Sequence, residues 1–189
     1  MSKLYFRYGS MNSGKSSALM QVAYNYEENN KKVLVIKSVI DTKGEEYLES
    51  RIGLKRRVDV LLKLDDSIRD INIEGISCIL VDEAQFLTEK QVADLWEITK
   101  EFDVPVICYG IRTDFTGNLF PGSLKLFALA DELEELITIC SCGKRAKFNA
   151  RFVDGTFVKD GDSVLIDGSN TKVSYKPMCG KCFLKNLKQ

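Results

Sequence analysis

Histidine is absent from the 189-residue sequence. Its side chain titrates nearest to neutral pH and is the commonest metal ligand in proteins. A general base that works near neutral pH must therefore be a carboxylate or a lysine here. Any metal site must be built from cysteine or carboxylate groups.

A surplus of positive charge is missing as well. The 27 lysine and arginine residues equal the 27 aspartate and glutamate residues, so the formal net charge is zero. Proteins that bind nucleic acid backbones by counterion release usually carry such a surplus. We therefore do not expect nucleic acid as a partner.

Long hydrophobic runs are also lacking. No stretch of about 18 consecutive apolar residues occurs, and the first residues show no apolar region with a small-residue cleavage site. We therefore expect no membrane partner and a cytoplasmic location. In a reducing compartment the six cysteines argue against a disulfide framework, which leaves metal binding, catalysis or core packing.

Apolar runs alternate with segments of helical spacing in the first two thirds of the chain. Strands are predicted at the short run that contains Leu4 and at residues 33–39, 76–84 and 104–110, and helices at 16–29 and 88–101. Thr88 followed by Gln91 is a capping-box pattern for the second helix. Strands that alternate with helices predict an α/β fold, with a mostly parallel sheet covered by helices on both faces. Residues 40–57 are polar and weakly periodic, so we expect a long mobile loop there.

The pattern changes after about residue 136. From there the chain shows short strands, glycine-rich turns and two cysteine pairs, with no helical periodicity before the last few residues. A composition with 44% hydrophobic residues supports one domain and a small second lobe. We predict a nucleotide-binding α/β domain at 1–136 and a β-rich lobe at 137–189.

The stretch "YGSMNSGKSS" contains a phosphate-binding pattern. Gly9, Gly14, Lys15 and Ser16 fit G-x-x-x-x-G-K-[ST] between a predicted strand and a predicted helix. The glycines let backbone N–H groups approach an anion, and the helix adds the positive end of its dipole. Lys15 would then neutralise the β- and γ-phosphates, and Ser16 would ligate Mg²⁺. The alternative is a flexible turn with a solvated lysine; the flanking strand and helix favour a P-loop NTPase-like domain.

Two acidic residues, Asp82 and Glu83, end the buried strand "ILVDEA". Open α/β sheets bind their ligands at this end of their strands. Neighbouring residues on a strand face opposite ways, so the two carboxylates should serve different roles, one at the metal and one at the nucleophile. Because histidine is absent, Glu83 is our candidate general base. The alternative is that both groups simply end a strand in water.

The four cysteines nearest the C-terminal end form two close pairs with adjacent glycines, which suits a closed tetrahedral zinc site. The pairs are Cys140 with Cys142 and Cys179 with Cys182. Four thiolates leave no open position, so the zinc would be structural. C-x-C is less typical than C-x-x-C, and disulfides or free thiols remain alternatives. Cys78 and Cys108 lie inside strand runs and are expected in the core.

The sequence resembles the type II thymidine kinases, which are P-loop, zinc-containing enzymes. The resemblance rests on "GSMNSGKS", "DEAQFL", "GIRTDFTGNLFPGS", both cysteine pairs and the interval between them. It covers essentially the whole chain. It implies transfer of the γ-phosphoryl group of Mg-ATP to the 5′-hydroxyl of thymidine, or of deoxyuridine, in nucleotide salvage. It also implies structural Zn²⁺, a homotetramer or dimer of dimers, and feedback inhibition by thymidine triphosphate.

The resemblance also implies a set of site residues. The catalytic residues would be Glu83, Lys15 and Arg151, the last near the phosphates. The nucleotide contacts would be Gly9, Ser10, Met11, Asn12, Ser13, Gly14, Lys15, Ser16, Asp82, Glu83, Ala84 and Gln85, with Ser16 and Asp82 at the magnesium. The nucleoside contacts would be Met11, Phe86, Phe115, Phe120, Asn149, Val164, Ile166, Gly168 and Tyr175, with residues 163–168 in a lasso-like loop of the zinc lobe.

Arg112 and the C-x-C spacing resemble a branch of the family found in some bacteria and phages rather than the animal enzymes, and the role of Arg112 stays open. Two positions depart from the usual family pattern. Lys43 stands where arginine is usual, which leaves its phosphate role open, and Asn149 stands where threonine is common. Two rival functions also remain. One is a P-loop ATPase switch in which Glu83 orients water and the zinc lobe binds a protein or nucleic acid; the other is a purely structural zinc module with an inert loop. The aromatic run "DFTGNLF" and the lack of basic surplus favour a small-molecule pocket, and the intact Gly-Lys-Ser triplet argues against an inert loop.

Overall fold

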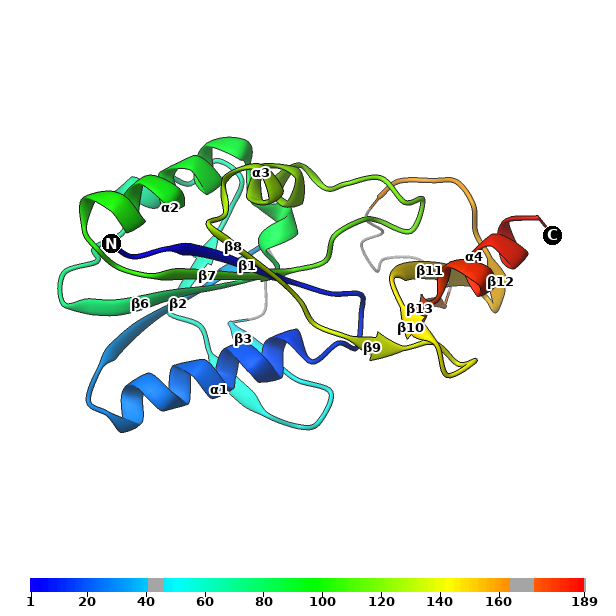
Figure 1. Ribbon diagram of the computed structural model, residues 1–189, viewed down its shortest axis with the longest axis horizontal. Helices are drawn as coiled ribbons and strands as arrows, with labels where there is room; N and C mark the ends of the chain where they lie inside the picture. The colour runs from blue at the N-terminus through cyan, green and yellow to red at the C-terminus, as the bar shows by residue number, and fades with distance from the viewer. Residues whose placement is uncertain (41–45, 164–171, 189) are drawn as a thin grey trace.

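A six-stranded parallel sheet lies at the centre of the larger part of the molecule, between helices (Figure 1). The computed structural model describes residues 1–40, 46–163 and 172–188. The sheet order is β5-β2-β6-β7-β1-β8, and all five neighbouring pairs are parallel. The strands are β1 (Leu4–Tyr8), β2 (Lys32–Ser38), β5 (Val60–Leu62), β6 (Ile76–Asp82), β7 (Val106–Gly110) and β8 (Glu132–Glu135).

Helices cover both faces of this sheet, as the sequence predicted. Helix α1 (Lys15–Glu28) lies on one face, and α2 (Glu89–Glu101) and α3 (Pro121–Leu129) lie on the other (Figure 1). Side chains along β6 point alternately to the two faces of the sheet. Ile79 and Val81 pack in the same cluster as Leu95 of α2. Cys78 and Leu80 pack in the same cluster as Leu19 of α1. The predicted fold class is confirmed. Within the described part of the chain, no helix is both long and apolar enough to cross a membrane.

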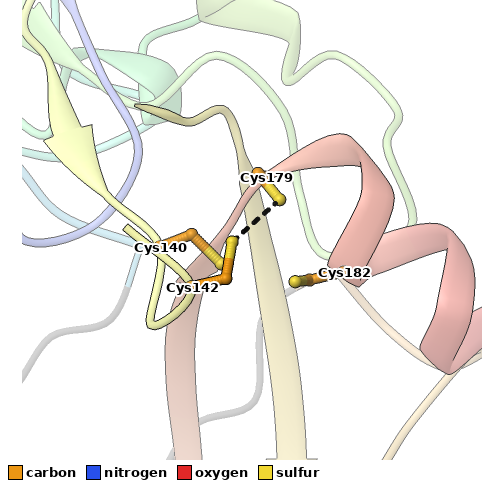
Figure 2. Close-up of side chains that lie close together, drawn as sticks. All are labelled: Cys140, Cys142, Cys179 and Cys182. Atoms are coloured by element: carbon orange, nitrogen blue, oxygen red, sulfur yellow. Dashed lines mark hydrogen bonds between the residues drawn. The ribbon is translucent and has the colours of Figure 1, made fainter. Parts of the chain in front are cut away.

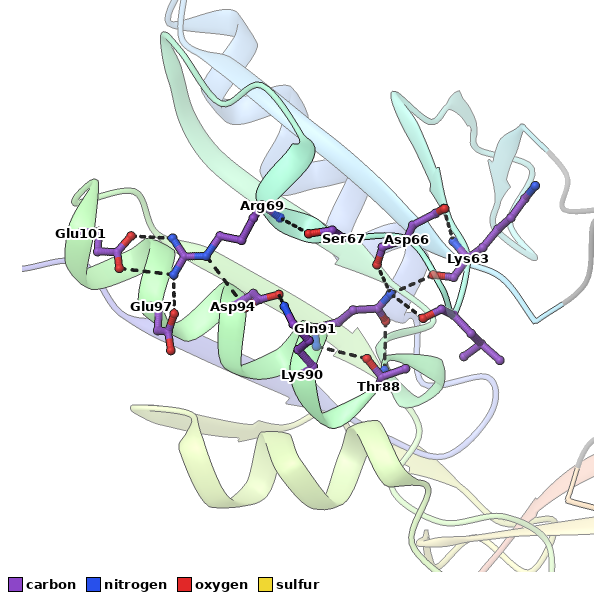
Figure 3. A network of polar contacts seen from close by, with 11 residues as sticks. Lys63, Asp66, Ser67, Arg69, Thr88, Lys90, Gln91, Asp94, Glu97 and Glu101 are labelled. Carbon is purple, nitrogen blue, oxygen red and sulfur yellow. Dashed lines mark hydrogen bonds and ion pairs between the residues drawn. The ribbon is translucent and has the colours of Figure 1, made fainter.

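Helix α2 begins at the predicted capping box. The Thr88 hydroxyl accepts from the Gln91 N–H at 3.2 Å, and the Gln91 side chain accepts from the Thr88 N–H at 3.0 Å. The Gln91 amide also donates to the carbonyls of Lys63 and Asp66 at 2.8 and 2.9 Å. In the same connection Arg69, in the short helix η1 (Ile68–Asp70), contacts Asp94, Glu97 and Glu101 of α2 (Figure 3). This network fixes the β5–β6 connection against α2.

The prediction of a long mobile loop at 40–57 was wrong for its second half. Strands β3 (Tyr47–Glu49) and β4 (Lys55–Arg57) pair antiparallel as a hairpin. Leu48 is buried in the cluster beneath α1, and Arg56 pairs with Glu27 of α1 at 2.7 Å. Three-residue strands show too little alternation to be recognised in a sequence, and docking on α1 supplies their order. Residues 41–45, which include Lys43, lie outside the described residues.

The chain after β8 forms a smaller assembly at one end of the molecule (Figure 1). Its elements are β9 (Thr138–Ile139), β10 (Arg145–Ala146), β11 (Phe148–Val153), β12 (Thr156–Phe157), β13 (Val173–Met178) and α4 (Gly180–Leu187). Strands β12, β11 and β13 form one small sheet, and β9 pairs with β10. Phe148 stacks on Phe183 at 4.7 Å within its core. A domain boundary at residue 136 stays a prediction.

Candidate active site and metal centre

The residues predicted to contact the nucleotide lie where three neighbouring strands end. Strand β7 lies between β1 and β6, so the loop after β1 and the turn after β6 flank the end of β7. The Gly9 N–H donates to the Gly110 carbonyl at 3.2 Å. A Cβ atom at Gly110 would lie 2.9 Å from the Gln85 side-chain oxygen and 3.1 Å from the Gln85 backbone nitrogen, so glycine leaves room for the turn after β6. The carboxyl ends of parallel strands are where such sheets bind ligands.

The phosphate loop folds tightly around the Lys15 ammonium. Lys15 Nζ donates to the Ser10 carbonyl at 3.0 Å and lies 3.4 Å from the Gly9 carbonyl and the Ser13 hydroxyl. Gly14 has φ +78°, a value that favours glycine. Among the described residues Lys15 forms no ion pair. A lysine held by neutral oxygens at a helix N-terminus fits a phosphate ligand.

The surroundings of Lys15 favour the arrival of an anion. Burial lowers the pKa of Lys15, because the charged ammonium has lost part of its hydration. The charges of Glu83 and Asp82 act in the opposite direction, and the charge of Arg51 lowers the pKa further. A phosphate group beside the ammonium would stabilise its charged form.

Asp82 meets Ser16 because of its place on β6. Counting along the strand, Asp82 shares a face with Cys78 and Leu80, the face covered by α1. Its Oδ2 atom accepts from the Ser16 hydroxyl at 3.2 Å. Burial, and next the charge of Glu83, raise the pKa of Asp82 to about 7. A hydroxyl and a carboxylate side by side suit Mg²⁺, which prefers oxygen ligands.

The Asp82→Asn variant is expected to melt at a higher temperature than the wild type at pH 8 without nucleotide. An unfolded aspartate ionises near pH 4, whereas folded Asp82 ionises near pH 7. Between these values the folded state retains a proton that the unfolded state has lost, so the stability of the wild type falls as pH rises. Melting curves from pH 5 to 8 should show the gap widening with pH. A gap of constant size would mean that the Asp82 carboxylate carries no such penalty.

The backbone turns sharply at Glu83, directly after the end of β6. Its φ of 53° and ψ of 36° lie in the left-handed region, which costs a non-glycine residue about 1 kcal/mol or more. Asp82 and Glu83 therefore diverge through this turn rather than through the strand alternation that the sequence suggested. Glu83 Oε2 accepts from Gln85 Nε2 at 2.5 Å, and Gln85 Oε1 accepts from the Ile111 N–H at 3.2 Å. Gln85, from the short helix η2 (Ala84–Phe86), thus orients the Glu83 carboxylate.

Lys15 and Glu83 line one cleft of about 480 Å³. The other lining residues are Met11, Asn12, Gly14, Ser16, Ser17, Glu49, Ser50, Arg51, Ile52, Gln85, Phe86 and Ile111. Gly9, Ser10, Asp82 and Ala84, which were also predicted to contact the nucleotide, are buried behind this surface. The sequence did not predict Ser17, Ile111 or the hairpin residues. Ile111 could have been predicted, because it directly follows strand β7, which ends at the same edge of the sheet. The sequence carries no comparable signal for the hairpin residues.

The aromatic residues assigned to the nucleoside extend from the cleft toward the small lobe. Phe86 lines the cleft, and Phe120 packs edge-on against it at 5.6 Å between ring centroids. Phe115 is buried and lies beneath the Arg151 guanidinium at 3.7 Å. Phe86 and Phe120 contact each other, but the Arg151 guanidinium covers the Phe115 ring. The three aromatic side chains therefore do not form one continuous apolar wall.

All three side-chain nitrogen atoms of Arg151 donate to groups of the lobe. Its side chain is buried, and its Nε atom donates to the Tyr175 hydroxyl at 2.9 Å. Its Nη atoms donate to the carbonyls of Asp162 and Ser163 at 2.7 and 3.0 Å. Arg151 does not line the cleft, so a role near the phosphates stays a prediction; its contacts hold the backbone of Asp162 and Ser163 in place. Val164, Ile166 and Gly168 lie outside the described residues.

Asn149 joins the lobe to the phosphate loop. It is buried, its Oδ1 atom accepts from the Met11 N–H at 2.7 Å, and its Nδ2 atom donates to the Thr113 carbonyl at 3.3 Å. Both ends of the amide thus contact backbone groups. Strand β11 of the lobe, the segment after β7 and the phosphate loop meet at this side chain.

The four cysteines converge as the sequence predicted (Figure 2). Their sulfur atoms all lie within 4.8 Å of one another, and those of Cys142 and Cys179 are 3.6 Å apart. Sulfurs around a tetrahedral zinc ion are about 3.8 Å apart, given Zn–S bonds of about 2.3 Å. The Gly143 N–H donates to the Cys140 carbonyl at 2.8 Å, which closes the first turn. The cluster has the spacing to bind zinc.

The electrostatics of this cluster also favour a cation. Backbone N–H groups of Cys142 and Cys179 donate to the Cys140 sulfur and lower its pKa to about 6. The neighbouring sulfurs raise the pKa of Cys182 to about 12. The Cys140 thiolate is thus favoured, while hydrogen bonds with the neighbouring sulfurs favour the protonated form of Cys182. A bound metal ion would displace this proton, because metal ligands of this kind are thiolates.

Comparison with known proteins identifies the family. The sequence model described as thymidine kinase matches residues 2–183. A thymidine kinase of Chromobacterium violaceum is 43% identical over 185 residues, covering 97% of this chain and 98% of the relative. A thymidine kinase of Pasteurella multocida is 45% identical over 180 residues, covering 92% and 94%. A third, from Haemophilus influenzae, is 42% identical over 192 residues, covering 96% and 100%. The chain belongs to the thymidine kinase family.

Proposed function

We propose that the cleft shared by Lys15 and Glu83 is where the γ-phosphoryl group of ATP passes to the 5′-hydroxyl of thymidine. Membership of the thymidine kinase family establishes the enzyme as a thymidine-phosphorylating phosphotransferase. The observation that carries the assignment of the site is that a phosphate-loop lysine and an oriented carboxylate line one cavity. Either the lysine or the carboxylate alone would also be compatible with a P-loop protein of another function.

The donor side is provided by the phosphate loop. The N–H groups at the start of α1 and the Lys15 ammonium would bind the β- and γ-phosphates and neutralise charge during the transfer. Ser16 and Asp82 would hold Mg²⁺, which supplies further charge neutralisation on the phosphates when bound. Because these groups are fixed by β1, β6 and α1, little reorganisation is needed at the moment of reaction.

The acceptor side is provided by Glu83 and the aromatic residues. Glu83 would accept the proton of the attacking 5′-hydroxyl, with its carboxylate oriented by Gln85. Phe86, backed by Phe120, would contact the nucleoside. A neutral nucleoside offers no charge to bind, so stacking and backbone hydrogen bonds are the interactions available.

Product analysis tests this assignment directly. ADP release should require thymidine, and deoxyuridine should be tested beside it. An ATPase switch, the main rival, would release ADP at the same rate without a nucleoside. That result would remove the proposed acceptor site.

The zinc lobe is proposed to position the nucleoside-binding segment. The Cys179→Ser variant is therefore expected to lose zinc and to raise KM for thymidine by about tenfold, with a smaller effect on KM for ATP. Metal content and both KM values would be measured. Lys181→Gln is the matched control, because this exposed residue lies between two of the cysteines and leaves all four sulfurs in place. Equal changes in the two KM values would contradict a specific role for the lobe.

Three properties follow from the family resemblance alone. We propose homotetrameric assembly, feedback inhibition by thymidine triphosphate and a cytoplasmic location. Light scattering would test the assembly, and inhibition curves with thymidine triphosphate would test the regulation.

A further inference from the structure

The hairpin turn places an arginine at the cleft. Glu49, Ser50, Arg51 and Ile52 all line the cavity that contains Lys15. Three hydrogen bonds of Ser50 close the turn. The Gly53 N–H donates to the Ser50 carbonyl at 2.9 Å, the Leu54 N–H donates to the Ser50 hydroxyl at 3.0 Å, and the Ser50 N–H donates to the Leu54 carbonyl at 2.8 Å. The backbone position of Arg51 is therefore well defined.

The hairpin is also anchored to the body of the domain. Leu48 is buried in the cluster beneath α1. Arg56 donates to both carboxylate oxygens of Glu27 on α1, at 2.9 and 2.7 Å. Arg51 thus reaches the cleft from a docked element.

Arg51 differs from the other cations of this hairpin. The others each have a carboxylate partner: Lys55 with Glu49 at 3.3 Å, Arg56 with Glu27 at 2.7 Å, and Arg57 with Glu46 at 3.2 Å. In the part of the chain that the structure describes, Arg51 forms no ion pair or hydrogen bond. The one hairpin cation that lines the cleft is thus the one without a partner.

Two cations therefore open onto the same cavity. Arg51 and Lys15 both line the cavity of about 480 Å³, Arg51 from the hairpin and Lys15 from the start of α1. The carboxylates of the cleft have other contacts, since Glu83 is bound by Gln85 and Glu49 by Lys55. Like charges that converge in this way are stabilised by an anion between them. A planar guanidinium matches the geometry of phosphate oxygens.

We propose that Arg51 binds the triphosphate of ATP from the hairpin side of the cleft, together with Lys15. This inference rests on the proposed function, because it takes ATP as the anion of the same site. It adds a second protein cation to the donor side, supplied by a segment outside the phosphate-loop motif.

The test compares Arg51→Gln with Arg51→Lys and Arg57→Gln. Arg51→Gln is expected to lower kcat/KM for ATP about tenfold, because a charge-assisted contact is lost, and to leave KM for thymidine within about twofold. Arg51→Lys should recover part of the loss, since it retains the charge but not the two-pronged geometry. Arg57→Gln, on the same hairpin, should behave as the wild type. Melting temperatures would confirm that all variants fold.

Equilibrium binding of ATP without nucleoside separates this inference from the proposed function. Weaker ATP binding by Arg51→Gln than by the wild type supports the contact, whatever the acceptor is. Equal ATP affinity in the two proteins overturns it. Equal losses for ATP and thymidine would also overturn it, because they would indicate a general distortion of the cleft. A wild type that binds ATP but does not phosphorylate thymidine would instead overturn the proposed function.

Discussion

The Glu83→Gln variant is expected to lower kcat for thymidine phosphorylation by about 1,000-fold, with ATP affinity close to that of the wild type. A general base contributes about 100- to 10,000-fold, and an amide cannot accept the proton of the 5′-hydroxyl. Glutamine is close to glutamate in size and can still accept a hydrogen bond from Gln85. The loss should therefore appear in kcat rather than in binding or folding.

Steady-state kinetics and ATP titration would measure these effects. Glu49→Gln is the matched control, because Glu49 lines the same cleft but pairs with Lys55. Its kcat should change little. Near-normal turnover by Glu83→Gln would exclude Glu83 as the base.

The Lys15→Met variant is expected to lower kcat/KM for ATP by about 1,000-fold. The Lys15 ammonium contacts backbone carbonyls of the phosphate loop. Its positive charge is needed both to bind the triphosphate and to stabilise the transferred phosphoryl group. Methionine retains much of the side-chain volume, so the fold should persist. Thymidine affinity should change far less than ATP affinity.

Direct ATP binding and single-turnover rates would separate the two contributions. Lys31→Met, which removes an exposed lysine beyond α1, serves as the control. ATP binding and turnover by Lys15→Met at wild-type levels would show that the loop does not hold the donor phosphates.

Structure that depends on neighbouring residues in the chain was predictable. The phosphate loop, the strand runs and the capping box at Thr88 each arise from short-range spacing, and each is present. Cys78 and Cys108 are buried in the core, as their places within apolar strands indicated. Such features are encoded by hydrogen-bond periodicity and by side-chain alternation within a few residues.

The sequence did not predict two elements whose apolar residues do not line one face, helix α3 and the β3–β4 hairpin. Helix α3 was not predicted, although Pro121 stands at a favoured position in its first turn. Its apolar residues lie on more than one side, so Leu126 is buried while Leu124 is half exposed. The β3–β4 hairpin was missed because its order comes from contacts with α1. For this reason Arg51 was not among the predicted site residues.

The chemistry of the site follows from residue types that the sequence displays directly. The absence of histidine leaves carboxylate and lysine for proton transfer, the Gly-Lys-Ser triplet supplies an anion site, and two cysteine pairs supply sulfur ligands. Only the tertiary structure decided which of these groups share a cleft. The order of strands puts β7 between β1 and β6, and across this edge the Ser16 hydroxyl donates to Asp82. Docking on α1 brings the hairpin to the cavity that Lys15 lines. Contacts of this kind depend on packing between distant segments, which local spacing along the chain does not encode.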